Sequence, residues 1–339
     1  MKTTAAFSRL WRFTDRVRLA FEPPALVATR APRIGLCLSS GGARGLAHVG
    51  VIQVLEENHV PITAIAGSSM GAYVGALWAA GVSGAKLEEL AREIKNRRAL
   101  LNLLDPVFPP TVGLIRGDKL RRHLERTLGA MTFAELRTPL LVVATDLATR
   151  APHLFDEGPV AAAVHASSAI PGICAPVLLN GRHYTDGGTA QPLPVRLLRE
   201  RFEVDRVLAV NLVPTPLDFA RDQQAPPPPS RNPLRWLWQK FNLMADGNVI
   251  DTFQRSLLSA QMNIAAVECT RADVVLHPAF DAFAWQDFEH YDRYIKAGRE
   301  AALAALPEIM ALTRNNPPSK GGGYYETTAS HTTLGLVRR

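Results

Sequence analysis

A serine flanked by glycines follows an apolar run early in the chain. The segment Gly67-Ser68-Ser69-Met70-Gly71 comes directly after the apolar residues 62–66, and small apolar residues continue to position 80. At a sharp turn between a strand and a helix, flanking glycines leave room for the bend and the serine is raised above the sheet edge. The positive end of the helix dipole also favours a developing alkoxide. The glycine spacing predicts Ser69 as a nucleophile, with Ser68 as the rival; the alternative interpretation is an ordinary turn in which Ser69 caps the helix.

A second glycine-rich turn, Ser39-Ser40-Gly41-Gly42-Ala43-Arg44-Gly45, follows the apolar residues 34–38. Glycines let backbone N–H groups converge on one point, and such donors stabilise a tetrahedral oxyanion. The competing interpretation is a dinucleotide-binding loop. However, Ser40 occupies the first glycine position of that motif, and the acidic Glu56 and Glu57 lie at a predicted helix end rather than on a second strand. No Gly-Lys-Ser/Thr follows, which excludes the phosphate-binding loop of an NTPase.

An aspartate at a third turn completes a set of groups that acyl transfer requires. Asp186-Gly187-Gly188 follows residues 177–184, which carry Asn180-Gly181 between two extended runs, a strong signal for a β-hairpin. A carboxylate placed by a hairpin and flanked by glycines can act as a general base; the alternative interpretation is a simple turn. Together the three turns predict a nucleophile, an oxyanion loop and a base.

Histidines and cysteines offer weaker alternatives. In α/β-hydrolase order, His277 or His290 would be the base of a Ser-Asp-His triad, whereas the simpler interpretation of His277 is a hydrogen-bonded residue at a strand end. His48 is expected to pack inside a buried helix or to support the site. No spacing of histidine and acidic residues resembles a metal site, and the three cysteines form no Cys-x-x-Cys pair. We therefore expect no metal, no cofactor and a reducing compartment.

Apolar runs alternate with helical patterns from residue 33 onward. The runs at 34–38, 62–66, 140–144, 207–212 and 274–276 predict buried strands, and helices are predicted at about 46–55, 70–80, 85–98 and 117–128. Strands that alternate with helices predict an α/β domain whose mostly parallel sheet is covered on both faces.

Composition divides the chain into three parts. Residues 1–32 are a basic segment in which aromatic and aliphatic residues are interleaved with arginines, so that a helix there would suit a membrane surface or, alternatively, pack over the core. Residues 33–313 form the predicted catalytic domain, with a proline-rich insertion at about 214–245. In this insertion Trp236 and Trp238 lie beside cations, which suits a lipid interface or a lid over an acyl pocket. Residues 314–339 are predicted to be a disordered tail.

The overall charge favours an anionic partner. The 339 residues carry a formal net charge of +7, which is typical of proteins that meet nucleic acid or lipid phosphates. No nucleic-acid-binding module is recognisable, so we expect no nucleic-acid partner. No apolar run approaches the roughly 18 residues that span a bilayer, and arginines interrupt the N-terminal segment where a secretory signal needs an apolar core. We expect a cytoplasmic protein with peripheral contact to the inner face of the membrane.

The three motifs together resemble those of the patatin-like phospholipases, and most of all the bacterial members related to the catalytic domain of neuropathy target esterase. The similarity lies in residues 36–51, 67–72 and 186–188, and residues 143–147 and 166–172 also look familial. It extends over most of the chain, from about residue 33 to about residue 312. The resemblance implies a three-layer α/β/α fold with a mostly parallel central sheet.

The resemblance also implies a catalytic dyad in place of a triad. Ser69 would attack an ester carbonyl after Asp186 accepts its proton, and water would then hydrolyse the acyl-enzyme. Partial burial would raise the basicity of the carboxylate. Backbone amides of the glycine-rich loop would hold the oxyanion and a loop arginine would orient it; these residues are Gly41, Gly42, Ala43 and Arg44.

One position departs from the family pattern. The family loop begins with three glycines, and here Ser40 takes the first place. If that position donates a hydrogen bond or needs a positive φ, oxyanion stabilisation would weaken; because serine is small and two glycines remain, we expect modulation of activity. The leading hypothesis is a serine lipid acyl hydrolase, either a phospholipase, a lysophospholipase or a general carboxylic ester hydrolase. The second is a non-catalytic lipid-binding or regulatory protein on the same scaffold.

Overall fold

The computed structural model describes residues 30–94, 105–107, 113–216, 218, 248–280, 287–315 and 323–326. The elements described below belong to one compact unit, residues 32–339. The predictions for residues 1–29, for most of the insertion with Trp236 and Trp238, and for most of the C-terminal tail lie outside the described residues.

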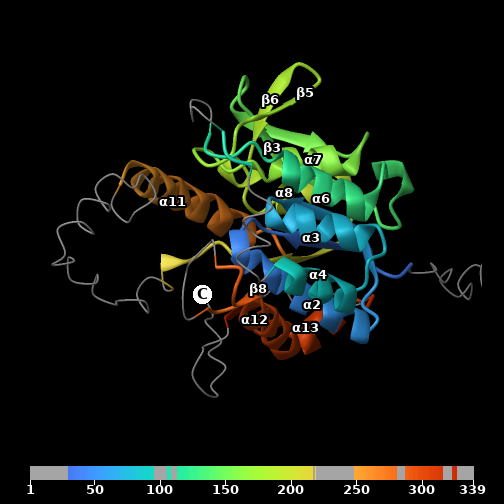
Figure 1. The fold of residues 1–339 in the computed structure, drawn as a ribbon. Helices are drawn as coiled ribbons and strands as arrows, with labels where there is room; N and C mark the ends of the chain where they lie inside the picture. Colours follow the sequence, from blue (N-terminus) through green and yellow to red (C-terminus); the bar gives the residue numbers. More distant parts are fainter. Residues whose placement is uncertain are drawn as a thin grey trace, which may run out of the picture. The chain divides into compact units, whose positions relative to one another are not determined.

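A central sheet positions the three turns. Within the described residues it has nine strands in the order β5-β6-β3-β2-β1-β7-β8-β9, with β4 paired to β3. The five strands predicted from apolar runs are all present and run parallel to their neighbours among these five: β1 (Ile34–Leu38), β2 (Ile62–Ser68), β3 (Leu140–Asp146), β7 (Arg206–Val210) and β8 (Val274–His277). The mostly parallel sheet is therefore confirmed (Figure 1).

An antiparallel edge joins this sheet at β3, through β4 (Ala151–Phe155) and the hairpin of β5 (Val177–Leu179) and β6 (Arg182–Thr185). The predicted turn of the hairpin is present. Asn180 and Gly181 have φ values of 50° and 76°, as a two-residue turn with a left-handed backbone requires. Because β6 pairs with the end of β3, the hairpin carries Asp186 to the carboxyl ends of the parallel strands.

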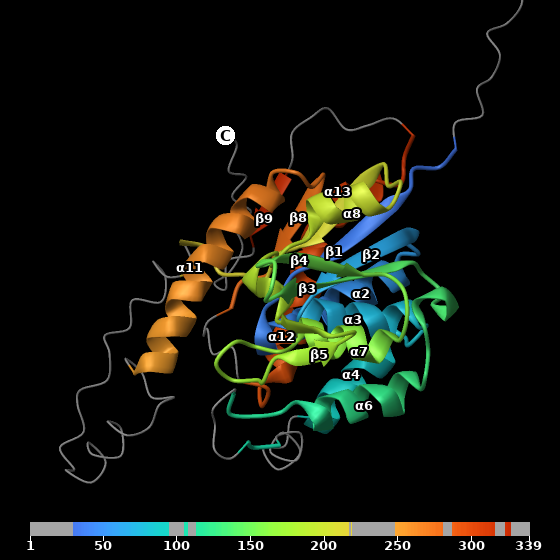
Figure 2. The ribbon, with the colours of Figure 1, turned by 90° about the horizontal axis from the view of Figure 1, so that it is seen from above.

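Helices cover both faces of the sheet, which gives the three layers that the family resemblance implied. One core is formed with α2 (Ala47–Glu57), α3 (Met70–Ala79), α4 (Gly84–Ile94), α6 (Asp118–Leu128), α7 (Val160–Ser167), α12 (Tyr291–Ala304) and α13 (Leu306–Ala311). The other is formed with α8 (Val195–Arg201) and α11 (Val249–Cys269). Strand β1 alternates between them, since Leu36 and Leu38 belong to the first core and Cys37 to the second. Figure 2 shows the helices on the two sides of the sheet.

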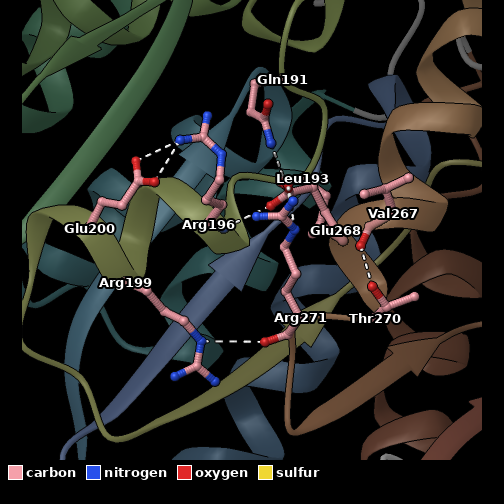
Figure 3. A network of polar contacts seen from close by, with 9 residues as sticks. All are labelled: Gln191, Leu193, Arg196, Arg199, Glu200, Val267, Glu268, Thr270 and Arg271. Atoms are coloured by element: carbon pink, nitrogen blue, oxygen red, sulfur yellow. Dashed lines mark hydrogen bonds and ion pairs between the residues drawn. The ribbon is translucent and has the colours of Figure 1, made fainter.

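A buried carboxylate holds α11 to α8 (Figure 3). The Glu268 side chain accepts a hydrogen bond of 2.7 Å from the Arg196 N–H in the first turn of α8, where a helix lacks internal acceptors. Arg271 lies 3.5 Å from the other carboxylate oxygen. Arg199 donates to the Arg271 carbonyl and forms an ion pair with Asp273. These contacts fix the C-terminal half of α11 against the sheet and involve none of the predicted site residues.

Several elements have no counterpart in the predictions. Strand β4 and helices α7, α11 and α12 were not predicted. Strand β9 (Gly323–Glu326) lies within the tail for which disorder was predicted, so that prediction does not hold for these four residues. β9 pairs with β8, and the open edge of β8 offers backbone groups that a short segment with two tyrosines can satisfy. Among the described residues, no helix is long and apolar enough to cross a membrane.

Candidate active site

Ser69 lies at a sharp bend between β2 and α3. Its φ of 55° and ψ of −122° are unusual for a residue with a side chain and cost on the order of 1–3 kcal/mol. The glycines on either side are required for the bend: a Cβ atom on Gly71 would lie 2.3 Å from the Leu38 carbonyl oxygen, and one on Gly67 would lie 2.6 Å from the Ala72 nitrogen. The Ser69 side chain makes no capping hydrogen bond to α3. Ser69 therefore occupies the N-cap position of α3, but its side chain does not cap the helix.

The Ser69 hydroxyl donates a hydrogen bond of 2.5 Å to Oδ2 of Asp186, across 117 positions of the chain. Both residues are buried, with 7% and 5% of their surface exposed. The second carboxylate oxygen, Oδ1, accepts the Gly188 N–H at 2.7 Å. The structure thus brings the predicted nucleophile and the predicted base into direct contact, and it fixes the orientation of the carboxylate.

Burial makes Asp186 a stronger base than an ordinary carboxylate. Desolvation raises the pKa of Asp186 to about 6, and the hydrogen bonds from Ser69 and Gly188 act in the opposite direction. The charged form is disfavoured because the site is withdrawn from water. A base whose pKa lies closer to neutrality accepts a proton more readily from a serine hydroxyl.

Hydroxyl groups from β3 and α7 hold the dyad in place. The Ser69 N–H donates to Ser167 Oγ at 2.8 Å, and the Ser167 hydroxyl donates to the Val143 carbonyl at 2.6 Å. The Thr145 hydroxyl donates to the Asp186 carbonyl at 2.9 Å. In the sequence, Thr145 and Ser167 were identified only as members of two segments that resemble the family, residues 143–147 and 166–172. The signal that could have identified them is a hydroxyl side chain at the carboxyl end of a buried strand or helix.

The predicted oxyanion residues lie together at the start of the short 3-10 helix η1 (Gly42–Leu46). Gly42 has a φ of 57°, and the first N–H groups of a helix have no acceptor within it. The loop lies beside the nucleophile, because a Cβ atom on Gly45 would lie 2.2 Å from Cγ of Met70, the residue after Ser69. Gly41, Gly42, Ala43 and Arg44 are thus brought next to the serine bend.

Arg44 supports this loop from inside. The side chain is buried, and its Nε donates to the Gly41 carbonyl at 3.3 Å. Burial lowers the pKa of Arg44 to about 10, while Tyr294 and Asp218 act in the opposite direction. The guanidinium therefore keeps its charge at neutral pH, close to the place where negative charge would develop.

Ser40 satisfies neither condition under which it would weaken the oxyanion loop. It is absent from the described residues with positive φ, so it needs no glycine-like backbone. Its N–H donates to the Pro192 carbonyl at 2.8 Å and is not available to an oxyanion. Its side chain lies against Gly188, where a Cβ atom would be 2.8 Å from Ser40 Oγ.

The variant Ser40→Gly is accordingly expected to keep its kcat within about threefold of the wild-type value, because the loop amides are unchanged. Its free energy of unfolding should fall by about 0.5–1 kcal/mol, since glycine has more freedom in the unfolded chain. Ester hydrolysis and thermal unfolding measure the two effects. A kcat changed more than about tenfold would show that the Ser40 side chain takes part in the reaction.

The rival residues have other contacts. Ser68 is fully buried, and its hydroxyl has no hydrogen-bond partner among the described residues. His277 contacts Asp218 and the Asn211 carbonyl, and His290 contacts Asp287 near the surface. In the part of the chain that the structure describes, the Asp186 carboxylate accepts from the Ser69 hydroxyl and the Gly188 N–H, and these contacts lend the triad prediction no support.

His48 lies behind the loop. Its Nε2 bonds the Ser39 carbonyl at 2.9 Å, and burial lowers its pKa to about 4, which keeps the ring neutral. Within the described ranges, no group of three or more histidine, cysteine, aspartate or glutamate side chains is placed to hold a metal ion.

Comparison with known proteins identifies relatives of this chain. Residues 36–199 match the family model described as patatin-like phospholipase. An uncharacterized NTE family protein of Mycobacterium tuberculosis is 41% identical over 206 residues, which cover 59% of this chain and 56% of that protein. Human patatin-like phospholipase domain-containing protein 6 is 27% identical over 289 residues, which cover 80% of this chain and 20% of that protein. The chain thus spans little more than half of the first relative and a fifth of the second.

A solved structure shares the fold. VipD from Legionella pneumophila superposes with a TM-score of 0.51 at 15% sequence identity, over 82% of this chain and 67% of that one. At this level of identity the likeness concerns the arrangement of helices and strands alone. It agrees with the three-layer architecture described above.

Proposed function

We propose that this chain, which matches the patatin-like phospholipase model over residues 36–199, is a serine lipid acyl hydrolase in which Ser69 and Asp186 form the catalytic dyad. The observation that carries the proposal is the hydrogen bond of 2.5 Å between the Ser69 hydroxyl and Asp186 Oδ2. It lies at the N-terminus of α3 and beside a glycine-rich loop, which are the surroundings that acyl transfer requires.

In the acylation step, Asp186 Oδ2 accepts the hydroxyl proton while Ser69 Oγ forms a bond to the carbonyl carbon of the ester. The carbonyl oxygen takes up the negative charge, and the backbone amides at Gly41, Gly42 and Ala43 stabilise it, with Arg44 behind them. As the tetrahedral intermediate collapses, the bond to the alcohol breaks. Asp186 returns its proton to the leaving alkoxide, which departs as an alcohol.

In the deacylation step, Asp186 accepts a proton from water while the water oxygen attacks the acyl-enzyme. The same loop amides stabilise the second oxyanion. Collapse of this intermediate releases the carboxylic acid, and the proton on Asp186 returns to Ser69 Oγ. Each step uses side chains of this chain and water, so the proposed mechanism requires no cofactor and no metal.

The proposed substrates are carboxylic esters of lipids, either phospholipids or lysophospholipids. This substrate class follows from the match to the patatin-like phospholipase model, and the net charge of +7 favours contact with an anionic lipid surface. The alternative function, a non-catalytic lipid-binding or regulatory protein, was suggested by Ser40 and by the basic segments that contain aromatic residues. Two observations favour catalysis. Ser40 has no positive φ, and the Ser69 hydroxyl is hydrogen-bonded to Asp186.

Incubation of the protein with a mixed lipid extract, followed by mass spectrometry of the products, tests the substrate class. We expect free fatty acids to appear together with the matching deacylated lipids, and Ser69→Ala under the same conditions to release neither. If the wild-type protein hydrolyses a short p-nitrophenyl ester but releases no fatty acid from any lipid, the lipid part of the proposal fails and a general esterase remains.

A further inference from the structure

A chain of buried polar groups connects the end of β8 to the oxyanion loop. We propose that the buried pair of His277 and Asp218 positions this loop, and in particular aims the Gly41 N–H at the oxyanion. The inference rests on the proposed function. It assigns His277, which takes no part in the dyad, the role of a positioning residue.

His277 lies between two hydrogen-bond acceptors. It is buried, with 2% of its surface exposed. Its Nδ1 is 2.8 Å from the Asn211 carbonyl oxygen, and its Nε2 is 3.0 Å from Asp218 Oδ2. The ring thus bridges the backbone at Asn211, next to the end of β7, and the side chain of Asp218.

Further hydrogen bonds fix the carboxylate of Asp218 beside His277. Its Oδ2 also accepts the Thr215 N–H at 2.6 Å and the Thr215 hydroxyl at 2.9 Å. An oxygen with three donors around it is an ionised carboxylate oxygen. Burial acts to raise the pKa of Asp218, but the hydrogen bonds and charge of His277 and the bonds from Thr215 outweigh it, so the pKa lies below its ordinary value.

The pair reaches the oxyanion loop through Asn211, Leu212 and Ser39. His277 fixes the Asn211 carbonyl, and the next N–H, that of Leu212, donates to Ser39 Oγ at 2.8 Å. The Ser39 hydroxyl in turn donates to the Ser40 carbonyl at 2.9 Å. Every link is buried, where hydrogen bonds are stronger than in water.

The last link determines where an oxyanion donor points. The Ser40 carbonyl and the Gly41 N–H belong to one planar peptide group, in which they point in opposite directions. A hydrogen bond that holds the carbonyl therefore also aims the N–H. Leu212 limits the position of Gly41 further, because a Cβ atom on Gly41 would lie 3.2 Å from Leu212 Cβ.

The charges around the pair fit the same role. Asp218 also interacts electrostatically with the buried Arg44. The carboxylate that is hydrogen-bonded to His277 thus also interacts with the guanidinium that supports the loop. Fixed positive charge in a water-excluded site stabilises an oxyanion without reorganisation.

The smallest change that breaks the connection is Ser39→Ala, which removes one oxygen atom and leaves the dyad intact. We expect kcat on a short p-nitrophenyl ester to fall by about 10- to 100-fold, less than for complete loss of an oxyanion donor, with KM within about threefold. The rate of Ser69 labelling by a fluorophosphonate should fall in parallel. Unchanged kcat in folded Ser39→Ala, or a loss confined to KM, overturns the inference.

Variants of Asp218 test whether its hydrogen bond with His277 contributes to the position of the loop. Asp218→Ala should lower kcat by about tenfold or more, whereas Asp218→Asn, whose amide oxygen can still accept from His277, should retain most of it. Equal loss in both folded variants, or in neither, contradicts the positioning role.

Glu268→Gln is the matched control, because Glu268 is a buried carboxylate that caps α8 and pairs with Arg271, away from the proposed connection. It should lose stability and keep kcat. If Asp218→Ala does not fold, Ser39→Ala decides the question alone. Failure of the proposed function is distinguishable, because the wild-type protein would then show neither ester hydrolysis nor labelling at Ser69.

Discussion

Replacement of Ser69 by alanine is expected to reduce kcat on a short p-nitrophenyl ester by roughly 10⁴-fold or more, because no acyl-enzyme can form. The fold should survive the change. Alanine has the same backbone restriction as serine at a φ of 55°, and the side-chain hydrogen bond that is lost is the one to Asp186. Initial rates and thermal unfolding of the purified variant measure the two effects.

Ser68→Ala is the matched control for this experiment. Ser68 is adjacent in sequence and fully buried, and its hydroxyl has no partner among the described residues. Removal of an unbonded buried hydroxyl is nearly neutral or stabilising, so the control should keep wild-type turnover. Full activity of Ser69→Ala, or loss of activity in Ser68→Ala with the fold intact, would contradict the assignment of the nucleophile.

Replacement of Asp186 by asparagine is expected to have an effect of similar size on kcat, roughly 10³-fold or more. The amide has the shape of the carboxylate but cannot accept the Ser69 proton. In the wild-type protein the base must be ionised, and the pKa of Asp186 is raised to about 6 by burial. The wild-type kcat/KM should therefore fall as the pH is lowered through about 6.

The same variant should be more stable than the wild-type protein near neutral pH. The folded-state pKa of Asp186 lies above its value in the unfolded chain, so its ionisation disfavours folding. This contribution to stability is fully present below about pH 4 and is lost as the pH rises through about 6. The rise in the pKa of Asp186 from its ordinary value of 3.8 to about 6 corresponds to about 3 kcal/mol. Asparagine avoids this penalty and can still bond Gly188 and Ser69 through its oxygen and nitrogen.

Thermal unfolding of Asp186→Asn and of the wild-type protein between pH 4 and pH 8 tests whether ionisation of Asp186 lowers the stability of the fold. The stability gap should be widest above pH 6 and close toward pH 4. A variant that is inactive and also less stable across the whole range would mean that the carboxylate is needed for the structure. Retained activity would point to another base, and His277→Ala would then be the next variant to measure.

The sequence predicts the reacting groups because their requirements are local. A nucleophile at a sharp bend needs Gly67 and Gly71, and the hairpin before Asp186 needs Asn180-Gly181. Such patterns are visible within a few residues. The five parallel strands were predictable for the same reason, since a strand buried on both faces is a short continuous apolar run.

The groups that support the dyad were not predictable in this way. Ser167, Thr145, Asp218 and Asn211 are ordinary residue types, and their roles arise from contacts between distant segments, such as the 59 positions that separate Asp218 from His277. Strand β9 forms by pairing with the open edge of β8. No local sequence pattern indicates this pairing. Whether Ser40 weakens the loop depends on its φ and on the partner of its N–H, which a local sequence pattern does not give.

The identity of the nucleophile can be tested directly by mass spectrometry after reaction with a fluorophosphonate probe. One adduct per chain is predicted, on Ser69, with a labelling rate that falls below about pH 6 and is almost abolished in Asp186→Asn. An adduct on Ser68 or on another residue, or a folded wild-type protein that never reacts, would contradict a dyad of Ser69 and Asp186.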